Sequence, residues 1–500
     1  MKQLFFVAIT LLLFTKNFGQ ITQVARKEIE LDDEGVGNTT PVGDKGVLVH
    51  GRVERTGEPD VWRITQLDES FFEKNVATIS IPDKYYEVGN IKSEDNKMLY
   101  LLFANKKSQF QLSSYNTVTL QTNSVTGAMP PKFYVTGMAL LNNSLFLKGV
   151  MKKDQVLVVI DCGSGKSSIV VLPGAGLKMT IQDMEPDNKQ GIMAVSVVYG
   201  KGKKVTDKIF QTCFFNASGE KVDEPFKIQN EPGKYTISSS VTWLSKNHFL
   251  VSGSYSSDAD YGANGIYVAE FENGDQKFIK YHNFADLKNF LNYLSKNKQA
   301  KMQKKIAKKK EKGQDNIIEA SITTHPIYEF NGEYVLIGEV YFATYRQEAY
   351  TTYVNGKPQT NYRTVFDGYQ YSHATVITMD KSGNKSSDYC FEMWLSYKPF
   401  SVIKNLRGVY TADEMRLFFS TGTELKSMTI KKGNVYSESN LGKIETEKEG
   451  DKVKWTGFTE SYYWYDNYFI CYGSQRIKNT EDNSVKKKRT VFFVSKIKVN

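Results

Sequence analysis

The chain has 500 residues, of which 40% are hydrophobic and 13% aromatic, and its formal net charge at pH 7 is +10. This composition fills a large core and excludes an intrinsically disordered chain. The 30 Tyr and 30 Phe residues favour a mostly β protein, because aromatic side chains suit pleated, half-buried surfaces.

The N-terminal residues predict a secretory signal peptide over residues 1–19. Lys2 precedes an apolar stretch from Leu4 to Leu13, and the small Gly19 stands just before Gln20, as signal peptides require. No later segment approaches the roughly 18 apolar residues that span a bilayer as a helix. We therefore expect a periplasmic or secreted protein, with peripheral attachment to the outer membrane as a further option.

Strand-like apolar segments recur along the chain at intervals of about 50 residues, except across two longer gaps. They are residues 46–53, 98–105, 144–151, 192–200, 248–255, 333–342, 415–422 and 468–475. Hairpin patterns with a polar, Gly-containing turn follow several of them, at 156–172, 209–228, 265–281 and 373–393. Self-similarity at this period is typical of a β-propeller. The sequence predicts one all-β propeller domain over residues 20–500, with seven or eight four-stranded blades, eight if the first and last units do not share a blade.

The segment "VVIDCGSGKSS", residues 158–168, has the last letters of a phosphate-binding loop but not its geometry. The first glycine of such a loop would fall on Ile160, and a β-branched run follows where a helix should begin,. The letters instead predict a hairpin turn, in which Asp161 bonds its own backbone and Gly165 adopts a positive φ. We expect the same of Asn216 with Gly219 and of Asp380 with Gly383.

The "IDCGSGK" turn resembles the D-x-x-x-G-[KE] turn of quinoprotein-type propellers, a superfamily whose repeats are related in architecture to WD-like blades. Two departures weaken the match: Asn216 and Asp380 reach their glycines one residue sooner, and the tryptophan that docks neighbouring blades is missing after these turns. The Lys-, Asn- and Tyr-rich composition and the "FGQ" signal end are similar to exported propellers of Bacteroidota-type bacteria. That resemblance implies a propeller fold and, for some such proteins, a place as a subunit of an envelope machine.

The sequence predicts neither a metal nor a cofactor. Cys162, Cys213, Cys390 and Cys471 form no C-x-x-C pair, and we expect mostly buried free thiols, with two disulfides as the alternative. The five histidines lack ligand spacing,. No G-x-S-x-G or H-E-x-x-H motif is present, so no catalytic residue is assigned.

Residues 285–313 predict a basic helical insertion, with the helix over 285–312. Leu287, Phe290, Leu291 and Leu294 fall on one stripe, Asp286 stands near the start, and Gly313 is a stop,. Ten lysines lie between residues 286 and 312, and the candidate residues for an anionic surface are Lys301, Lys304, Lys305, Lys308, Lys309 and Lys310. Nucleic acid is a poor candidate ligand, because residues 285–312 contain no arginine, and the protein is expected to be exported. A solubilising charged arm is the alternative.

Residues 341–373 predict a protruding β-arm, because Asn355-Gly356 is a strong hairpin turn,. Tyrosine and arginine are enriched in interface hot spots, although cross-strand packing explains a tyrosine equally well. The candidate partner-binding residues are Tyr345, Arg346, Tyr350, Tyr353, Tyr362, Arg363, Tyr369, Tyr371 and His373.

Together these features favour a non-enzymatic binding or scaffold protein of the cell envelope, with a protein partner such as an outer-membrane protein. The alternative is a secreted propeller enzyme acting on glycans, a hydrolase or lyase. Its carboxylates would come from Asp258, Asp260, Glu339 or Asp367,. Carboxylates and aromatic rings clustered around the propeller axis would favour the enzyme.

Overall fold

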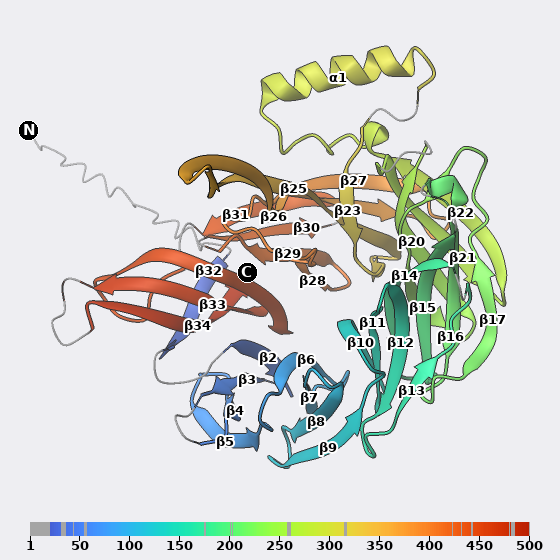
Figure 1. Cartoon of the computed structure of the whole chain (residues 1–500). Coiled ribbons are helices and arrows are strands. Elements are labelled where there is room, and N and C mark those ends of the chain that lie inside the picture. Colours follow the sequence, from blue (N-terminus) through green and yellow to red (C-terminus); the bar gives the residue numbers. More distant parts are fainter. Residues whose placement is uncertain are drawn as a thin grey trace, which may run out of the picture.

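The computed structural model describes residues 21–499 except 32–36, 44, 55–57, 175–176, 201, 203, 258–261, 315–317, 423, 432, 442–443, 480 and 482–485. Within that part of the chain, the strands form eight antiparallel sheets arranged as blades around an axis (Figure 1). The expected signal peptide, and Asp258 and Asp260, lie outside the described residues.

The first four blades follow one another in sequence, each with its first strand nearest the axis. Blade 1 contains β2 (Asn38–Val42), β3 (Gly46–Val53), β4 (Val61–Leu67) and β5 (Glu73–Ser80). Blade 2 contains β6 (Tyr86–Lys92), β7 (Met98–Ala104), β8 (Gln109–Asn116) and β9 (Thr122–Ala128). Blade 3 contains β10 (Phe133–Leu141), β11 (Ser144–Met151), β12 (Asp154–Asp161) and β13 (Ser167–Val170). Blade 4 contains β14 (Lys178–Asp187), β15 (Ile192–Gly200), β16 (Ile209–Phe215) and β17 (Lys221–Lys227), with a 3-10 turn at Val205–Asp207.

In blades 5 and 6 the inner position is shared by two short strands. Blade 5 contains β18 (Tyr235–Thr236), β19 (Ser240–Ser245), β20 (His248–Ser256), β21 (Gly265–Glu272) and β22 (Asp275–Asn283). Blade 6 contains β23 (Ser321–Thr324), β24 (Tyr328–Phe330), β25 (Glu333–Val354), β26 (Lys357–Met379) and β27 (Lys385–Glu392). Blade 7 contains β28 (Arg407–Tyr410), β29 (Glu414–Ser420), β30 (Leu425–Lys431) and β31 (Asn434–Leu441). Blade 8 contains β32 (Asp451–Tyr465), β33 (Tyr468–Asn479), β34 (Lys488–Val499) and β1 (Ile21–Glu30).

The core is a ring of eight hydrophobic clusters, each joining one blade to the next. One of them includes Phe146 of blade 3 and Val195 of blade 4. Because both faces of the middle strands are covered, these strands are apolar without alternation, as in "LVV" of β12,. All eight strand-like segments expected from the sequence are the second strands of their blades, so the prediction of seven or eight blades is confirmed with eight.

The hairpin turns have the predicted chemistry. Asp161 Oδ1 accepts the backbone N–H of Ser164 at 2.7 Å, and Gly165 has φ +71°. Asn216 and Asp380 make corresponding bonds to their own turns, and Gly219 and Gly383 also have positive φ. No disulfide joins the four cysteines, and three of them are buried.

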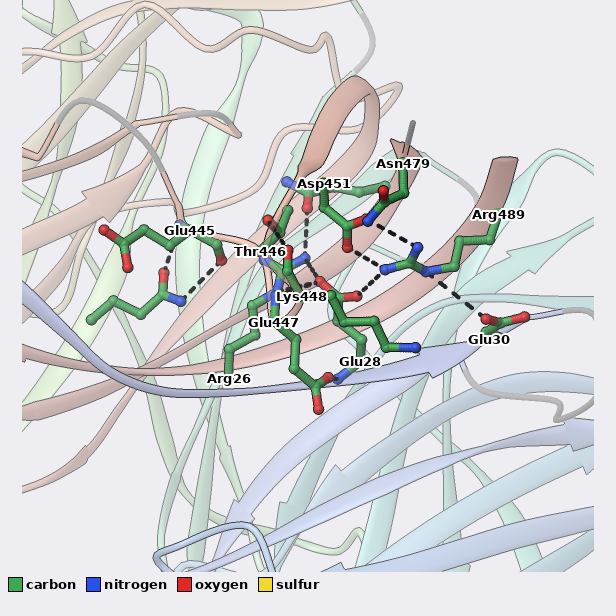
Figure 2. Close-up of polar contacts among 12 residues, drawn as sticks. Arg26, Glu28, Glu30, Glu445, Thr446, Glu447, Lys448, Asp451, Asn479 and Arg489 are labelled. Carbon is green, nitrogen blue, oxygen red and sulfur yellow. Dashed lines mark hydrogen bonds and ion pairs between the residues drawn. The ribbon is translucent and has the colours of Figure 1, made fainter. Parts of the chain in front are cut away.

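The ring closes through β1, which the sequence did not predict. The first and last strand units occupy separate blades, and β1 pairs with β34 from Ile21↔Val499 to Glu30↔Val491. Figure 2 shows the polar network that fastens this joint, in which Arg489 reaches Asp451, Glu28 and Glu30.

This network is almost fully enclosed. The side chains of Arg489 and Asp451 are 1% and 0% exposed, and Glu28 lies 2.8 Å from Arg26 and 3.2 Å from Arg489. Glu447, in the segment before β32, adds a further bond, because its carboxylate accepts the backbone N–H of Glu28 at 2.6 Å (Figure 2). Two cations therefore neutralise the buried acids at the joint.

The basic insertion is helical over a shorter stretch than predicted. The helix α1 spans Lys296–Lys310 after the N-cap position Ser295, whereas Phe284–Asp286 form a 3-10 turn. Asp388, a residue of β27, accepts the backbone N–H groups of Lys288 and Asn289 at 3.1 and 2.7 Å. This tertiary contact holds residues 287–295 outside the helix. Gly313 ends the helical segment as predicted, with φ +67° and its N–H on the Lys310 carbonyl.

The apolar stripe of the insertion still docks on the propeller. Leu287, Phe290 and Leu291 are buried between blades 5 and 6. The half-buried Met302 and Ile306 of the helix pack against the same cluster, and the helix lies outside the ring of blades in Figure 1. None of the described helices is long and apolar enough to cross a membrane.

Candidate functional site

The predicted arm is a long ribbon formed by β25 and β26 (Figure 1). Asn355 and Gly356 have φ +52° and +74°, as the predicted two-residue hairpin turn requires. The neighbouring strands of blade 6 end earlier, since β23 pairs as far as Tyr341 and β27 as far as His373. Beyond those positions the described strands of the ribbon pair only with each other.

The ribbon has two faces of opposite character. Residues directly opposite each other share a face, and faces alternate along each strand. The uncharged face consists of the pairs Tyr345–Phe366, Gln347–Thr364, Ala349–Tyr362, Thr351–Thr360 and Tyr353–Pro358. The charged face consists of the pairs Arg346–Val365, Glu348–Arg363, Tyr350–Asn361, Thr352–Gln359 and Val354–Lys357.

All ten side chains of the uncharged face are exposed to solvent. Tyr345, Tyr353 and Tyr362 are 64%, 74% and 69% exposed. At the base of the ribbon, Phe366 lies 6.0 Å from the ring of Phe400, which is itself 75% exposed. Large exposed apolar surfaces mark interaction sites, so this face is the arm's strongest candidate surface.

The arginines predicted as partner-binding residues lie on the charged face. Arg363 lies 2.7 Å from Glu348 and Arg346 lies 3.5 Å from Asp367. The pKa of Glu348 is lowered by its hydrogen bond with Arg363. The charges of this face are thus largely satisfied within the arm.

Tyr371 and His373, also predicted as partner-binding residues, are fully buried at the root of the arm. The Tyr371 hydroxyl donates to the carbonyl of Ile403 at 2.6 Å. The His373 ring stacks on Tyr293 at 4.0 Å, and burial lowers its pKa to about 3. Tyr369 is half-buried against Tyr341. These three residues support the arm from below and do not contribute to its exposed surface.

The lysines predicted for the basic surface all lie on α1, together with Lys296 and Lys298. Five of the six predicted residues are exposed, and Lys309 is half-buried. Within the described part of the chain, only Lys310 among the helix lysines pairs with an acid, Asp286. The helix therefore presents an uncompensated positive field.

A third group, which the sequence did not reveal, lies where the inner strands surround the axis. This axial cluster comprises Lys148 from β11, Asp183 and Glu185 from β14, Tyr328 from β24, and Lys404 from the segment before β28. Burial and the neighbouring Asp183 carboxylate raise the pKa of Glu185 to about 8, although Lys404 opposes the shift.

A glycine admits the Lys148 side chain to the cluster. A Cβ atom at Gly137 would lie 2.6 Å from Lys148 Cε, so no other residue fits without displacing that side chain. Lys148 Nζ then donates to the Gln182 carbonyl at 3.3 Å, and burial lowers the Lys148 pKa. Because the residues of the axial cluster come from distant parts of the chain, no local sequence pattern predicts the cluster.

Two acids nominated for an enzyme have structural roles. Glu339 is completely buried and accepts bonds from His325 at 2.7 Å and from the backbone N–H groups of Asn405 and Leu406 at 3.0 and 2.9 Å. Burial alone would raise the pKa of Glu339, but these bonds hold it below its usual value. Glu339 thereby fixes the segment that carries Lys404. Asp367 pairs with Lys398 at 2.7 Å beside the arm.

In the described residues, His, Cys, Asp and Glu side chains form no group of three or more suited to holding a metal ion. No family model and no curated protein match the chain. Among solved structures, the dihydro-heme d1 dehydrogenase NirN aligns over 96% of this chain and 79% of its own, with 11% identity and a TM-score of 0.44. The Dos1 propeller aligns over 95% and 96%, with 9% identity and a TM-score of 0.44.

Prolyl oligopeptidase B from Galerina marginata aligns over 90% of this chain but only 55% of its own length, with 9% identity and a TM-score of 0.41. These proteins differ in activity, and likeness at this level does not transfer any of it. The eight sheets, the inner ring of first strands and the closure through β1 identify the chain as an eight-bladed β-propeller.

Proposed function

We propose that this propeller is a non-enzymatic binding or scaffold protein of the bacterial cell envelope, a periplasmic subunit of an outer-membrane or secretion complex. The observation that carries the proposal is the exposed, uncharged aromatic face of the arm. An isolated two-stranded ribbon is marginally stable in water, and its unpaired edges and aromatic rings offer both β-pairing and apolar burial to a protein.

The two faces of the arm give the proposal a matched test. The tagged protein would be purified from gently solubilised envelopes as wild type, as Tyr345→Ser/Tyr353→Ser/Tyr362→Ser, and as Arg346→Gln/Arg363→Gln. We expect a stoichiometric protein partner with the wild type and the arginine variant, and at least a roughly tenfold loss with the tyrosine variant, since interface tyrosines are frequent hot spots.

Two results would count against the proposal. A wild-type protein that elutes alone would remove the evidence for a partner. Equal losses in the two variants would show that the uncharged face is not the contact. Circular dichroism and the unfolding midpoint of each variant verify that the propeller remains folded.

The axial cluster favours the second candidate, an enzyme acting on glycans, since Glu185 has the raised pKa of a general acid,. Its geometry is less favourable. Glycosidases hold two carboxyl groups roughly 5 to 9.5 Å apart, whereas Asp183 and Glu185 lie within hydrogen-bonding reach of each other. The pair therefore leaves no room for a sugar or a water between its carboxyl groups.

If the enzyme hypothesis holds, Glu185→Gln would lower glycan cleavage by at least roughly a hundredfold, because general acid catalysis contributes about that much. The measurement is the release of new sugar ends from a panel of neutral and acidic polysaccharides. Glu87→Gln on the inner strand β6 is the control, because Glu87 bonds Asn90 at 3.2 Å outside the axial cluster. If the Glu185→Gln variant cleaves glycans as fast as the wild type, the axial cluster is not the catalytic site.

A further inference from the structure

A groove of about 950 Å³ separates the helix α1 from the root of the arm. This lysine–aromatic groove is lined by Lys305 and Lys309 of α1, by the aromatic rings of Tyr293, Phe342 and Trp394, and by Glu319. Its volume is at the upper end of the roughly 300 to 1,000 Å³ that ligand pockets span. It lies apart from the distal uncharged face of the arm, so a ligand here is independent of the proposed partner.

The basic wall carries charge that the protein leaves uncompensated. Lys305 and Lys309 are four residues apart and therefore stand on successive turns of one helix face, about 6 Å apart along its axis. Among the described residues neither lysine has an ion-pair partner. The other lysines of α1, with no acid between Lys296 and Lys310, add to the potential at the groove.

The groove is also lined by three aromatic rings, of which two are exposed. Phe342 and Trp394 are 46% and 41% exposed. Tyr293 stacks on the buried His373 ring at 4.0 Å and lies 6.4 Å from Trp394. The Tyr293 ring is held by this stacking, so a flat apolar ligand face would bind it with little loss of side-chain freedom,.

The combination of groups narrows the chemistry of the ligand. Ammonium groups bind carboxylates as point charges without demanding a planar fork, and aromatic rings contact the apolar C–H face of a sugar. The exposed Glu319 in the same lining can accept hydrogen bonds from sugar hydroxyl groups,. We propose that the lysine–aromatic groove binds an acidic polysaccharide, with uronate carboxylates on Lys305 and Lys309 and sugar rings against Trp394 and Phe342.

The test uses titration calorimetry of the intact protein with short oligosaccharides of galacturonate and of mannuronate. The groove variants are Lys305→Gln/Lys309→Gln and Trp394→Ala. The matched control is Lys301→Gln/Lys308→Gln, which removes the same charge from the same helix outside the groove lining. We expect affinity to fall at least about tenfold in both groove variants, and by clearly less in the control.

Neutral oligosaccharides of similar length are expected to bind much more weakly than the uronates. The proposal is overturned if neither uronate binds the wild type at low salt, or if the two lysine pairs lose affinity equally. Tighter binding of a single-stranded oligonucleotide, lost with Trp394→Ala, would likewise overturn it in favour of nucleic acid. Retention of the arm's protein partner in the groove variants separates this test from that of the proposed function.

Discussion

At the scale of single residues, several polar side chains of this propeller are fixed by burial in one protonation state. His50 is 1% exposed, and its Nδ1 accepts the indole N–H of Trp62 at 3.3 Å while Nε2 lies 3.1 Å from the Thr40 hydroxyl. The neutral imidazole of His50 therefore has both of its ring nitrogens in hydrogen bonds. Burial accordingly lowers the His50 pKa from 6.5 to about 3.

This residue gives the protein a predictable acid sensitivity. Because the folded pKa lies below the unfolded one, the stability that neutral His50 contributes is complete above about pH 6.5 and declines as the pH falls toward 3,. Between pH 7 and pH 5 the loss from His50 amounts to about 2 kcal/mol. Urea unfolding at the two pH values measures it, and in His50→Gln the difference between them should shrink by about that amount.

A second measurement does not depend on a variant that folds. In the wild type, the His50 ring resonance is expected to show no titration between pH 7 and pH 4.5. A titration midpoint near 6.5 would contradict the assignment.

At the scale of secondary-structure elements, the sequence predicted best where a strand is apolar on both faces. The segments 46–53, 144–151 and 192–200 coincide with β3, β11 and β15, because both faces of these strands are covered by neighbouring blades. The innermost strands were not predicted, because most of them lack a continuous apolar run. In β14, for example, Met184 stands between the axial acids Asp183 and Glu185.

The start of the helix in the insertion and the two faces of the arm are features that local sequence patterns do not determine. Helix propensity favoured residues 285–295, but Asp388, about a hundred positions later, binds their backbone and delays the helix. The arm followed from Asn355-Gly356 and its tyrosines. Its division into an uncharged and a charged face depends on register shifts near Tyr341 and Tyr345, which no sequence pattern reveals.

At the scale of the whole molecule, the ring depends on one joint between the two ends of the chain. Arg489→Met would leave Asp451 and Glu28 buried without their shared cation, so we expect it to lower the free energy of unfolding by about 3 to 5 kcal/mol. Arg476→Met is the control, because Arg476 is an exposed arginine of the same blade. It should change the unfolding free energy by less than about 1 kcal/mol.

Denaturant unfolding monitored by tryptophan fluorescence measures both variants. Equal destabilisation by the two substitutions would mean that the buried network does not fasten the ring. The network was beyond sequence reasoning because Glu28 and Arg489 belong to opposite ends of the chain, and each alone resembles an ordinary surface charge.

The joint also determines when the molecule can finish folding. Among the described strands, β1 is synthesised first and its partner β34 last, and their pairing includes Ile21 against Val499. Contacts this distant in sequence slow folding, and until they form, both strands present unpaired edges on which other chains can add. β1, the strand that closes the finished ring, therefore remains unpaired for longest during synthesis, and it must be protected from other chains for that time.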